Sequence, residues 1–253
     1  MKNFQTKLDV IGNNIANVNT YGFKKGRVVF KDMISQSAGS ASAPAGNRGG
    51  INPKQVGLGS QIASIDTIQT EGSSQSTNRV LDLAIAGDGY FVVGETGANA
   101  QHFFTRAGNF YLDNNGDLVT SDGLYVLDTA KGKINIPKDA KDVSISSDGT
   151  VKFLNAAGNI DGNQTIELAK FNNTGGLQKY GNNLFKDTTN SGIPLYDQRA
   201  SLGTIQSNML EMSNVDLSEE FTEMIVAQRG FQANTRIITT SDEILQELVN
   251  LKR

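Results

Sequence analysis

The chain of 253 residues contains no cysteine, no tryptophan and a single histidine, His102. Without cysteine it can form neither a disulfide framework nor a thiolate zinc site, and it has no cysteine nucleophile. One histidine cannot form a His–His metal pair, and no Ser/His/Asp arrangement can be assigned around it, so its ring is expected to be packed or to lie on the surface. We therefore expect no catalytic residue, no metal site, no cofactor and no enzymatic activity.

An excess of charge of one sign is also missing. Lys and Arg number 23 and Asp and Glu number 26, which excludes the strongly basic surface of a nucleic-acid-binding protein. The tightest basic cluster, Lys24, Lys25 and Arg27 with Lys31 a turn further on, is predicted to be a solvated face. No segment approaches the roughly 18 consecutive apolar residues of a membrane-spanning helix, so no membrane insertion is expected. The N-terminus also lacks the apolar run of a secretory signal.

Proline occurs only 4 times, whereas glycine occurs 27 times. Many Gly and Asn residues with little Pro indicate tight turns and short strands. Leu81, Leu83 and Ile85 alternate with Asp82 and Ala84, which predicts a half-buried strand. The other expected strands are 90–93, 110–112, 118–119, 124–127, 151–154 and 166–171.

Asn-Gly and Asp-Gly pairs between apolar runs are the strongest short-range hairpin signals. They occur here at Asp88-Gly89, Asn115-Gly116, Asp122-Gly123, Asp148-Gly149 and Asp161-Gly162. The middle of the chain is therefore predicted to be a mostly antiparallel β domain.

The N-terminal residues predict a helix. Its apolar residues recur in alternating steps of four and three, which is typical of the seam of a helix that packs on another helix. They are Phe4, Leu8, Ile11, Ile15 and Val18. The Asn residues at 13, 14, 17 and 19 weaken this helix, because Asn prefers caps and turns. Gly22 can adopt a positive φ, so the helix is expected to stop near Asn19 or Thr20.

A longer helix is predicted from Asp216, with Glu219 as the partner of its cap, to Lys252. It would span roughly 55 Å, which is too long for one compact domain to bury. Gly230 in its middle costs about 1 kcal/mol relative to Ala, and it is either a tolerated weak point or a close-approach site or flex point. The residues expected to form its interface are Phe221, Met224, Phe231, Ile238, Leu245 and Leu248.

Residues 35–60 are rich in Gly, Ser, Ala and Pro, which predicts a flexible linker or an extended arm ordered only by neighbours. The fold class is therefore α+β, with the β domain inserted between two terminal helices that pair. The predicted segments are 1–30 for the N-terminal helix, 31–75 for the bridging segment, 76–205 for the β domain and 206–253 for the C-terminal helix.

Two motifs suggest ligand sites but do not complete them. Asp113, Asn115 and Asp117 fall at the first three ligand positions of a calcium loop, yet leucines occupy the places that need Gly and the bidentate Glu. A hairpin turn is the better interpretation. Residues 57–59, Gly-Leu-Gly, lack the third glycine of a dinucleotide-binding fingerprint.

Several long motifs follow one another along the chain. NNIANVNTYGFK (13–24) is similar to the N-terminal signature of the bacterial flagellar hook and distal-rod protein family. LDLAIAGDGYF (81–91) and FTRAGNFYLDNNGDLVTSDGLYVL (104–127) are similar to its central motifs. The segment from NVDL to LVNL (214–251) is similar to its C-terminal signature, so the resemblance covers nearly the whole chain.

The resemblance implies a structural subunit of the hook or distal rod that polymerises into a helical tube, transmits torque and encloses an export channel. The terminal helices would pair as a coiled coil in the inner tube, and the β domain would lie outside. The Gly/Ser/Ala-rich segment would bridge neighbouring subunits. Head-to-tail contacts that do not close give such an open polymer.

The resemblance also implies the partners: copies of the chain itself, adjacent rod, hook or hook-junction proteins, and the flagellar export apparatus. The expected location is the flagellar hook or basal body, reached without a cleaved signal peptide. Family members usually begin further upstream, so the chain is expected to be truncated or to start at an internal methionine. Short Gram-positive hook proteins and distal-rod proteins both fit this length, and the hook is preferred.

One alternative is a non-catalytic surface-binding β module with helical tails, such as an adhesin or a carbohydrate binder. The apolar seams at both termini argue against it, because a monomeric binder has no reason to expose them.

Overall fold

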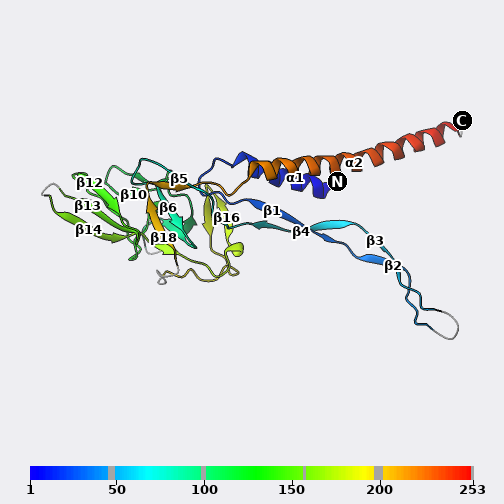
Figure 1. The fold of residues 1–253 in the computed structure, drawn as a ribbon, viewed down its shortest axis with the longest axis horizontal. Coiled ribbons are helices and arrows are strands. Elements are labelled where there is room, and N and C mark those ends of the chain that lie inside the picture. The colour runs from blue at the N-terminus through cyan, green and yellow to red at the C-terminus, as the bar shows by residue number, and fades with distance from the viewer. Residues whose placement is uncertain (45–48, 98–100, 156–157, 197–201, 252–253) are drawn as a thin grey trace. The chain divides into compact units, whose positions relative to one another are not determined.

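The computed structural model describes residues 1–44, 49–97, 101–155, 158–196 and 202–251, and the chain divides into two compact units (Figure 1). The first unit contains Met1–Ile15, Gly26–Thr67 and Leu217–Arg253. The second contains Ala16–Lys25 and Ile68–Asp216. The chain therefore passes between the units four times. Residues 16–25, which the sequence assigns to the N-terminal helical segment, belong to the second unit.

The first unit contains the two predicted terminal helices, α1 (Lys2–Ala16) and α2 (Leu217–Leu251). The prediction of a helix at each end of an α+β chain is confirmed. α1 ends slightly before the expected stop, since a turn follows in which Thr20 N–H donates to Asn17 O (3.1 Å). In Figure 1 the two helices run side by side in opposite directions, and α2 continues well past the N-terminus of α1.

The first unit also contains a β arm. β1 (Gly26–Asp32) pairs antiparallel with β4 (Ser60–Thr67), and β2 (Ser35–Gly39) pairs antiparallel with β3 (Lys54–Gly57). Much of the segment predicted to be a linker or an extended arm is thus paired strand. β2 consists of Ser, Gln, Ala and Gly. It therefore contains none of the β-branched or aromatic residues by which strands are recognised in a sequence.

The second unit is built of antiparallel strand pairs, which confirms the predicted β domain. Its main sheet has the order β16-β17-β8-β7-β11-β10-β9, with β15 paired to β7. These strands are β7 (Tyr90–Gly94), β8 (His102–Thr105), β9 (Tyr111–Leu112), β10 (Leu118–Val119), β11 (Tyr125–Val126), β15 (Leu168–Ala169), β16 (Gln178–Gly181) and β17 (Leu184–Lys186).

Smaller ladders complete the second unit. β12 (Asp142–Ile145), β13 (Thr150–Leu154) and β14 (Ile160–Thr165) form a three-stranded sheet. β6 (Leu83–Ala86) pairs with β18 (Thr204–Ser207), and β5 (Ser74–Ser76) pairs with β19 (Met209–Glu211). A short 3-10 helix, η1, covers Thr174–Gly176.

The core of the second unit consists of two hydrophobic clusters on opposite faces of β7. Phe91 and Val93 belong to one cluster, and Tyr90 and Val92 belong to the other. In β6 the first three residues, Leu83, Ala84 and Ile85, are all buried, and Ala86 is half-buried. The prediction of a half-buried strand there is wrong, because both faces of β6 are covered.

Three of the five predicted turns join paired strands. Asn115-Gly116 connects β9 to β10, Asp122-Gly123 connects β10 to β11, and Asp148-Gly149 connects β12 to β13. The three glycines have φ values of +84°, +82° and +77°, which are conformations that L-residues rarely adopt.

The other two pairs do not form the predicted hairpins. Asp88-Gly89 links β6 to β7, which do not pair with each other because β6 takes β18 as its partner. Asp161-Gly162 lies inside β14, at an irregularity in its register with β13. The positive φ of Gly162 serves this bulge rather than a hairpin turn.

Candidate functional site

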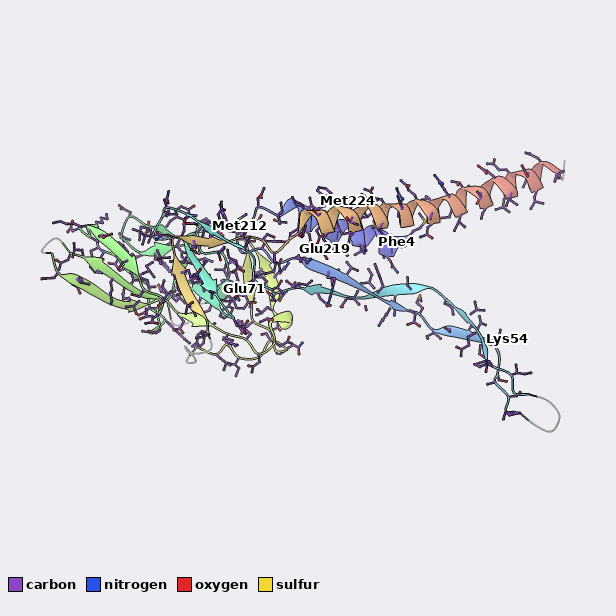
Figure 2. All side chains as sticks on the ribbon, viewed as in Figure 1. Phe4, Lys54, Glu71, Met212, Glu219 and Met224 are labelled. Carbon is purple, nitrogen blue, oxygen red and sulfur yellow. The ribbon has the colours of Figure 1, made fainter. Side chains whose placement is uncertain are left out.

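The candidate site for assembly is the pair of terminal helices in the first unit. Lys7 Nζ lies 3.0 Å from Glu223 Oε2, and Asn14 Nδ2 donates to Glu220 Oε2 at 3.1 Å. Phe4, labelled on α1 beside α2 in Figure 2, packs against Gly230. Residues further along α1 contact residues nearer the start of α2, so the two helices pair antiparallel within one chain.

Gly230 is a close-approach site. A Cβ at this position would lie 2.8 Å from Phe4 Cε1 and 2.9 Å from Phe4 Cζ, closer than side-chain carbons approach one another. The missing side chain thus forms a notch in α2 that receives the aromatic ring. Of the alternatives that the sequence left open, close approach is the one that this geometry supports.

Asn14 is buried at the meeting point of α1, β1 and α2. Its Oδ1 accepts a hydrogen bond from Gly26 N–H, and its Nδ2 donates to Gly26 O, both at 2.9 Å. The same Nδ2 donates to Glu220, which is itself buried. The expectation that Asn14 simply weakens the helix is therefore incomplete, because its amide connects three elements.

The residues predicted as a self-assembly interface occupy different environments. Ile11 is buried within the chain, and Val18 lies beyond the end of α1 in the second unit. Half-buried are Phe4, Leu8, Ile15, Met224 and Phe231, whereas Phe221, Ile238, Leu245 and Leu248 are exposed.

One row of residues on α2 explains this division. It advances in alternating steps of four and three: Glu220, Met224, Ala227, Phe231, Asn234, Ile238, Ser241, Leu245 and Leu248. The first five are buried or half-buried, and the last four are exposed. The face that α1 contacts in the first half of α2 thus continues, uncovered, along the second half.

A second candidate site is a buried charge cluster in the second unit. Lys24 Nζ lies 2.5 Å from Glu211 Oε1 and donates to Thr70 O at 2.8 Å. Arg106 Nη1 lies 3.4 Å from Glu211 Oε2, and Gly72 N–H donates to Glu211 Oε1 at 3.1 Å. The side chains of Lys24, Glu211 and Arg106 are at most 3% exposed. The prediction that Lys24 belongs to a solvated face is wrong, because a buried carboxylate compensates its charge.

Burial dominates the electrostatics of this cluster. Desolvation lowers the pKa of Lys24, although Glu211 acts in the opposite direction. Burial also raises the pKa of Tyr90 to about 12. The Tyr90 ring lies 5.1 Å from the guanidinium of Arg106, and its hydroxyl donates to Gln69 Oε1 at 2.9 Å.

The cluster lies where several segments of the second unit come together. Gly22 has a φ of +68°, and a Cβ there would lie 2.6 Å from Ala107 N, so no side chain fits. Asn214 Oδ1 accepts from Lys25 N–H at 2.8 Å, and its Nδ2 donates to Ile68 O at 2.9 Å. Residues 25 and 68 are the last and first residues of segments of the second unit, and residue 214 lies two positions before its end, so these bonds hold the chain near its passages to the first unit.

Sequence reasoning missed Arg106, Glu211 and Asn214 as members of this cluster. Arg106 and Asn214 lie inside the motifs that carry the family resemblance, and Glu211 lies just before one of them. No periodicity indicates that these charged groups meet, since the pairing depends on the tertiary fold.

Residues 113–117, which resemble the start of a calcium loop, form the hairpin turn that the sequence predicts. In this turn Asp113 N–H donates to Asp117 O at 2.9 Å. The carboxylate of Asp117 is occupied by Lys133 Nζ and Asn135 Nδ2, each at 2.6 Å. Burial raises the pKa of Asp117, but these hydrogen bonds outweigh it and the net shift is downward. Among the residues that the structure describes, no group of three or more His, Asp or Glu side chains could hold a metal ion.

No helix in the described part of the chain combines the length and the apolar character needed to cross a membrane.

Comparison with known proteins gives three matches to family models along the chain. Residues 1–24 match the flagella basal body rod protein, and residues 84–153 match the flagellar hook protein FlgE/F/G D1 domain. Residues 206–251 match the flagellar basal body rod FlgEFG protein C-terminal region.

Individual relatives align over nearly their whole length. The flagellar basal-body rod protein FlgG of Bacillus subtilis is 58% identical over 256 residues, covering 100% of this chain and 96% of the relative. FlgG of Agrobacterium fabrum is 39% identical, covering 95% of this chain and 91% of the relative. The flagellar hook protein FlgE of Borreliella burgdorferi is 31% identical over 433 residues, covering 100% of this chain and 97% of the relative.

Proposed function

This chain belongs to the family of flagellar hook and basal-body rod proteins and is a structural subunit of the flagellar axis, and we propose that its place is the rod. The observation that carries the proposal is the 58% identity to a rod protein over an alignment of 256 residues, nearly the length of this chain. The similar hook protein aligns over 433 residues at 31% identity, so long parts of it have no counterpart here. The rod therefore replaces the hook, which was preferred from the sequence although both fit the length.

We further propose that copies of the chain assemble through the second half of α2. At about 100° per residue, its large apolar side chains cover an arc of about 160°. They are Ile237, Ile238, Ile244, Leu245, Leu248, Val249 and Leu251, and all are more than half exposed. Such a continuous apolar face on a soluble subunit marks an interaction surface. In the tube, coiled-coil pairing would cover it.

The β arm is proposed to bridge neighbouring subunits. A lone two-stranded ladder is marginally stable in water. β2 and β3 are almost entirely exposed, and Ile34, Ile51, Val56 and Leu58 are all more than 60% exposed. Figure 2 shows Lys54 on this arm, with side chains extending from both strands. Contacts with other copies would cover these apolar groups and stabilise the ladder.

The family is structural, so we propose that the chain has no catalytic role. We also propose that it is a substrate of the flagellar export apparatus, without a cleaved signal peptide. No observation favours an adhesin or a carbohydrate binder.

Immunogold labelling of purified hook–basal bodies tests the proposed place in the axis. A strain that carries an epitope insertion in the exposed turn at Asp122-Gly123, outside the β arm and α2, should show gold on the rod. Label confined to the hook would overturn the rod assignment. Label on neither structure would overturn the place of the subunit in the axis itself.

A further inference from the structure

The helix pair contains a buried polar contact that apolar packing does not require. Asn14 is 2% exposed and Glu220 is 6% exposed, and their side chains are hydrogen-bonded at 3.1 Å. Burying such groups costs free energy, and apolar residues of similar volume are often neutral or stabilising in their place. In coiled coils, a single buried polar residue specifies register at a cost in stability.

We propose that the Asn14–Glu220 pair sets the register of α1 on α2. The orientation of the Asn14 side chain supports this role. Gly26 N–H and Gly26 O bind its oxygen and its nitrogen, so the amide is held in one orientation. The remaining N–H of Asn14 is thereby directed at α2, where only Glu220 among the neighbouring row positions offers a charged acceptor.

The apolar row of α2 cannot select a register by itself. Met224, Ala227 and Phe231 follow one another along this row about one turn apart, so a slip of one turn would again place apolar side chains against α1. The polar pair breaks this equivalence. Sliding α2 by one turn would place Met224, a side chain without a strong acceptor, opposite Asn14.

The other end of α1 adds a steric constraint in the same sense. The Phe4 ring occupies the notch left by Gly230, where even a Cβ would come within 2.8 Å. A slip of one turn would bring Val226 or Asn234 to this place, and either side chain would meet the ring. For the slip that brings Met224 opposite Asn14, polar pairing at one end and the notch at the other therefore act in the same sense.

In an assembled axis, many copies of α1 and α2 with identical seams would lie close together. The Asn14–Glu220 pair and the notch at Gly230 would then disfavour pairing of α1 with an α2 from another copy in a shifted register. This consequence for partner choice rests on the proposed function, whereas the register itself is a property of the single chain.

The absence of cysteine allows a direct measurement, because two introduced cysteines can carry nitroxide labels without background. Gln5 on α1 and Asp242 on α2 are exposed and suit this purpose. Their separation is measured by pulsed electron paramagnetic resonance in the unpolymerised full chain. A slip of one turn changes the distance along the helix axis by about 5 Å.

The variants Glu220→Leu and Glu220→Gln separate register from stability. Glu220→Gln keeps an acceptor for Asn14 and should retain a single distance. Glu220→Leu should show a second distance, shifted by about 5 Å, and it should also lower the urea midpoint of unfolding, because one N–H of Asn14 loses its acceptor. Combining it with Gly230→Ala should enlarge the second population, and this substitution also favours helix formation.

The matched control is Glu223→Leu, which removes a carboxylate that is 48% exposed and belongs to a surface ion pair with Lys7. It should leave one distance. A single, unchanged distance in both Glu220→Leu and the double variant would overturn the proposal. Because the measurement uses unpolymerised subunits, its failure is distinguishable from a failure of the chain to act as a rod subunit.

Discussion

Lys24 Nζ lies 2.5 Å from Glu211 Oε1, although the two residues are 187 positions apart in the sequence. Their contact joins the N-terminal signature motif to the strand that precedes α2. Arg106, from a central motif, approaches the other oxygen of the same carboxylate. Three distant parts of the sequence are thereby fixed to one buried anion.

The first prediction concerns unequal costs within this cluster. Glu211→Ala leaves Lys24 and Arg106 facing each other without their carboxylate, so it should lower the free energy of unfolding by about 3–5 kcal/mol. Lys24→Met should cost less, because Glu211 keeps Arg106 as its partner. Urea unfolding of the purified chain measures both. Equal losses would show that Arg106 does not compensate the charge of Glu211.

The second prediction concerns Gly22. Gly22→Ala combines a positive φ with a Cβ that would lie 2.6 Å from a backbone nitrogen, so we expect a loss of about 3 kcal/mol or more. Gly123→Ala is the matched control, because Gly123 has a φ of +82° but open space around it. It should cost only about 1 kcal/mol. Similar thermal midpoints for the two variants would contradict the steric argument.

The third prediction concerns pH and the single histidine. Burial, and secondarily the charge of Lys131, lowers the pKa of His102. The unfolded chain therefore binds a proton more readily, and stability should fall as the pH drops below about 6.5, the ordinary value for His. Proton NMR shows this titration without overlap, because no other histidine is present. His102→Asn should remove the corresponding part of the pH dependence, and a folded-state pKa above the ordinary value would contradict the prediction.

The fourth prediction separates subunit stability from assembly. Ile11 is buried in the single chain, so Ile11→Asp should destabilise the subunit itself by several kcal/mol. Leu245 is 59% exposed, so Leu245→Asp should change the free energy of unfolding by less than about 0.5 kcal/mol. Cells with Leu245→Asp should nevertheless be non-motile, with a soluble, folded subunit. Normal motility in these cells would show that this face is not an interface.

The fifth prediction concerns the β arm. Deleting residues 38–50 leaves β1 and β4 intact as well as both helices, so the subunit should fold and the axis should still form. The axis should differ in stiffness or curvature, and swimming should be impaired. Electron microscopy of isolated basal bodies tests this. If no axis forms while the subunit folds and is exported, the arm is instead an essential assembly contact.

The sequence predicts those parts of the fold whose signals are local. The alternating steps of four and three locate both helices, and three Asn-Gly or Asp-Gly pairs locate hairpins, because each pattern reflects the geometry of a few adjacent residues. β2 escapes prediction because its small polar residues form a ladder through the backbone alone. β8 pairs with β17, which lies about eighty residues further along the chain. No local pattern in the sequence can show such a pairing.

The candidate site divides in the same way. Apolar positions of the seam follow from periodicity, whereas Lys24 and Asn14 do not, since their types favour a solvated face and a turn. Their burial depends on partners brought close by the tertiary fold, Glu211 for one and Glu220 with Gly26 for the other. A charged or amide side chain is tolerated inside only when such partners exist.

The four passages of the chain between its two units have a mechanical consequence. Two units joined by one linker can swivel about it, and the whole load falls on a single peptide connection. Here any pull or twist on the helices is divided among four covalent connections that enter the second unit separately. A nick in one of them leaves three in place, so the two units stay tethered after a break that would release a singly linked domain.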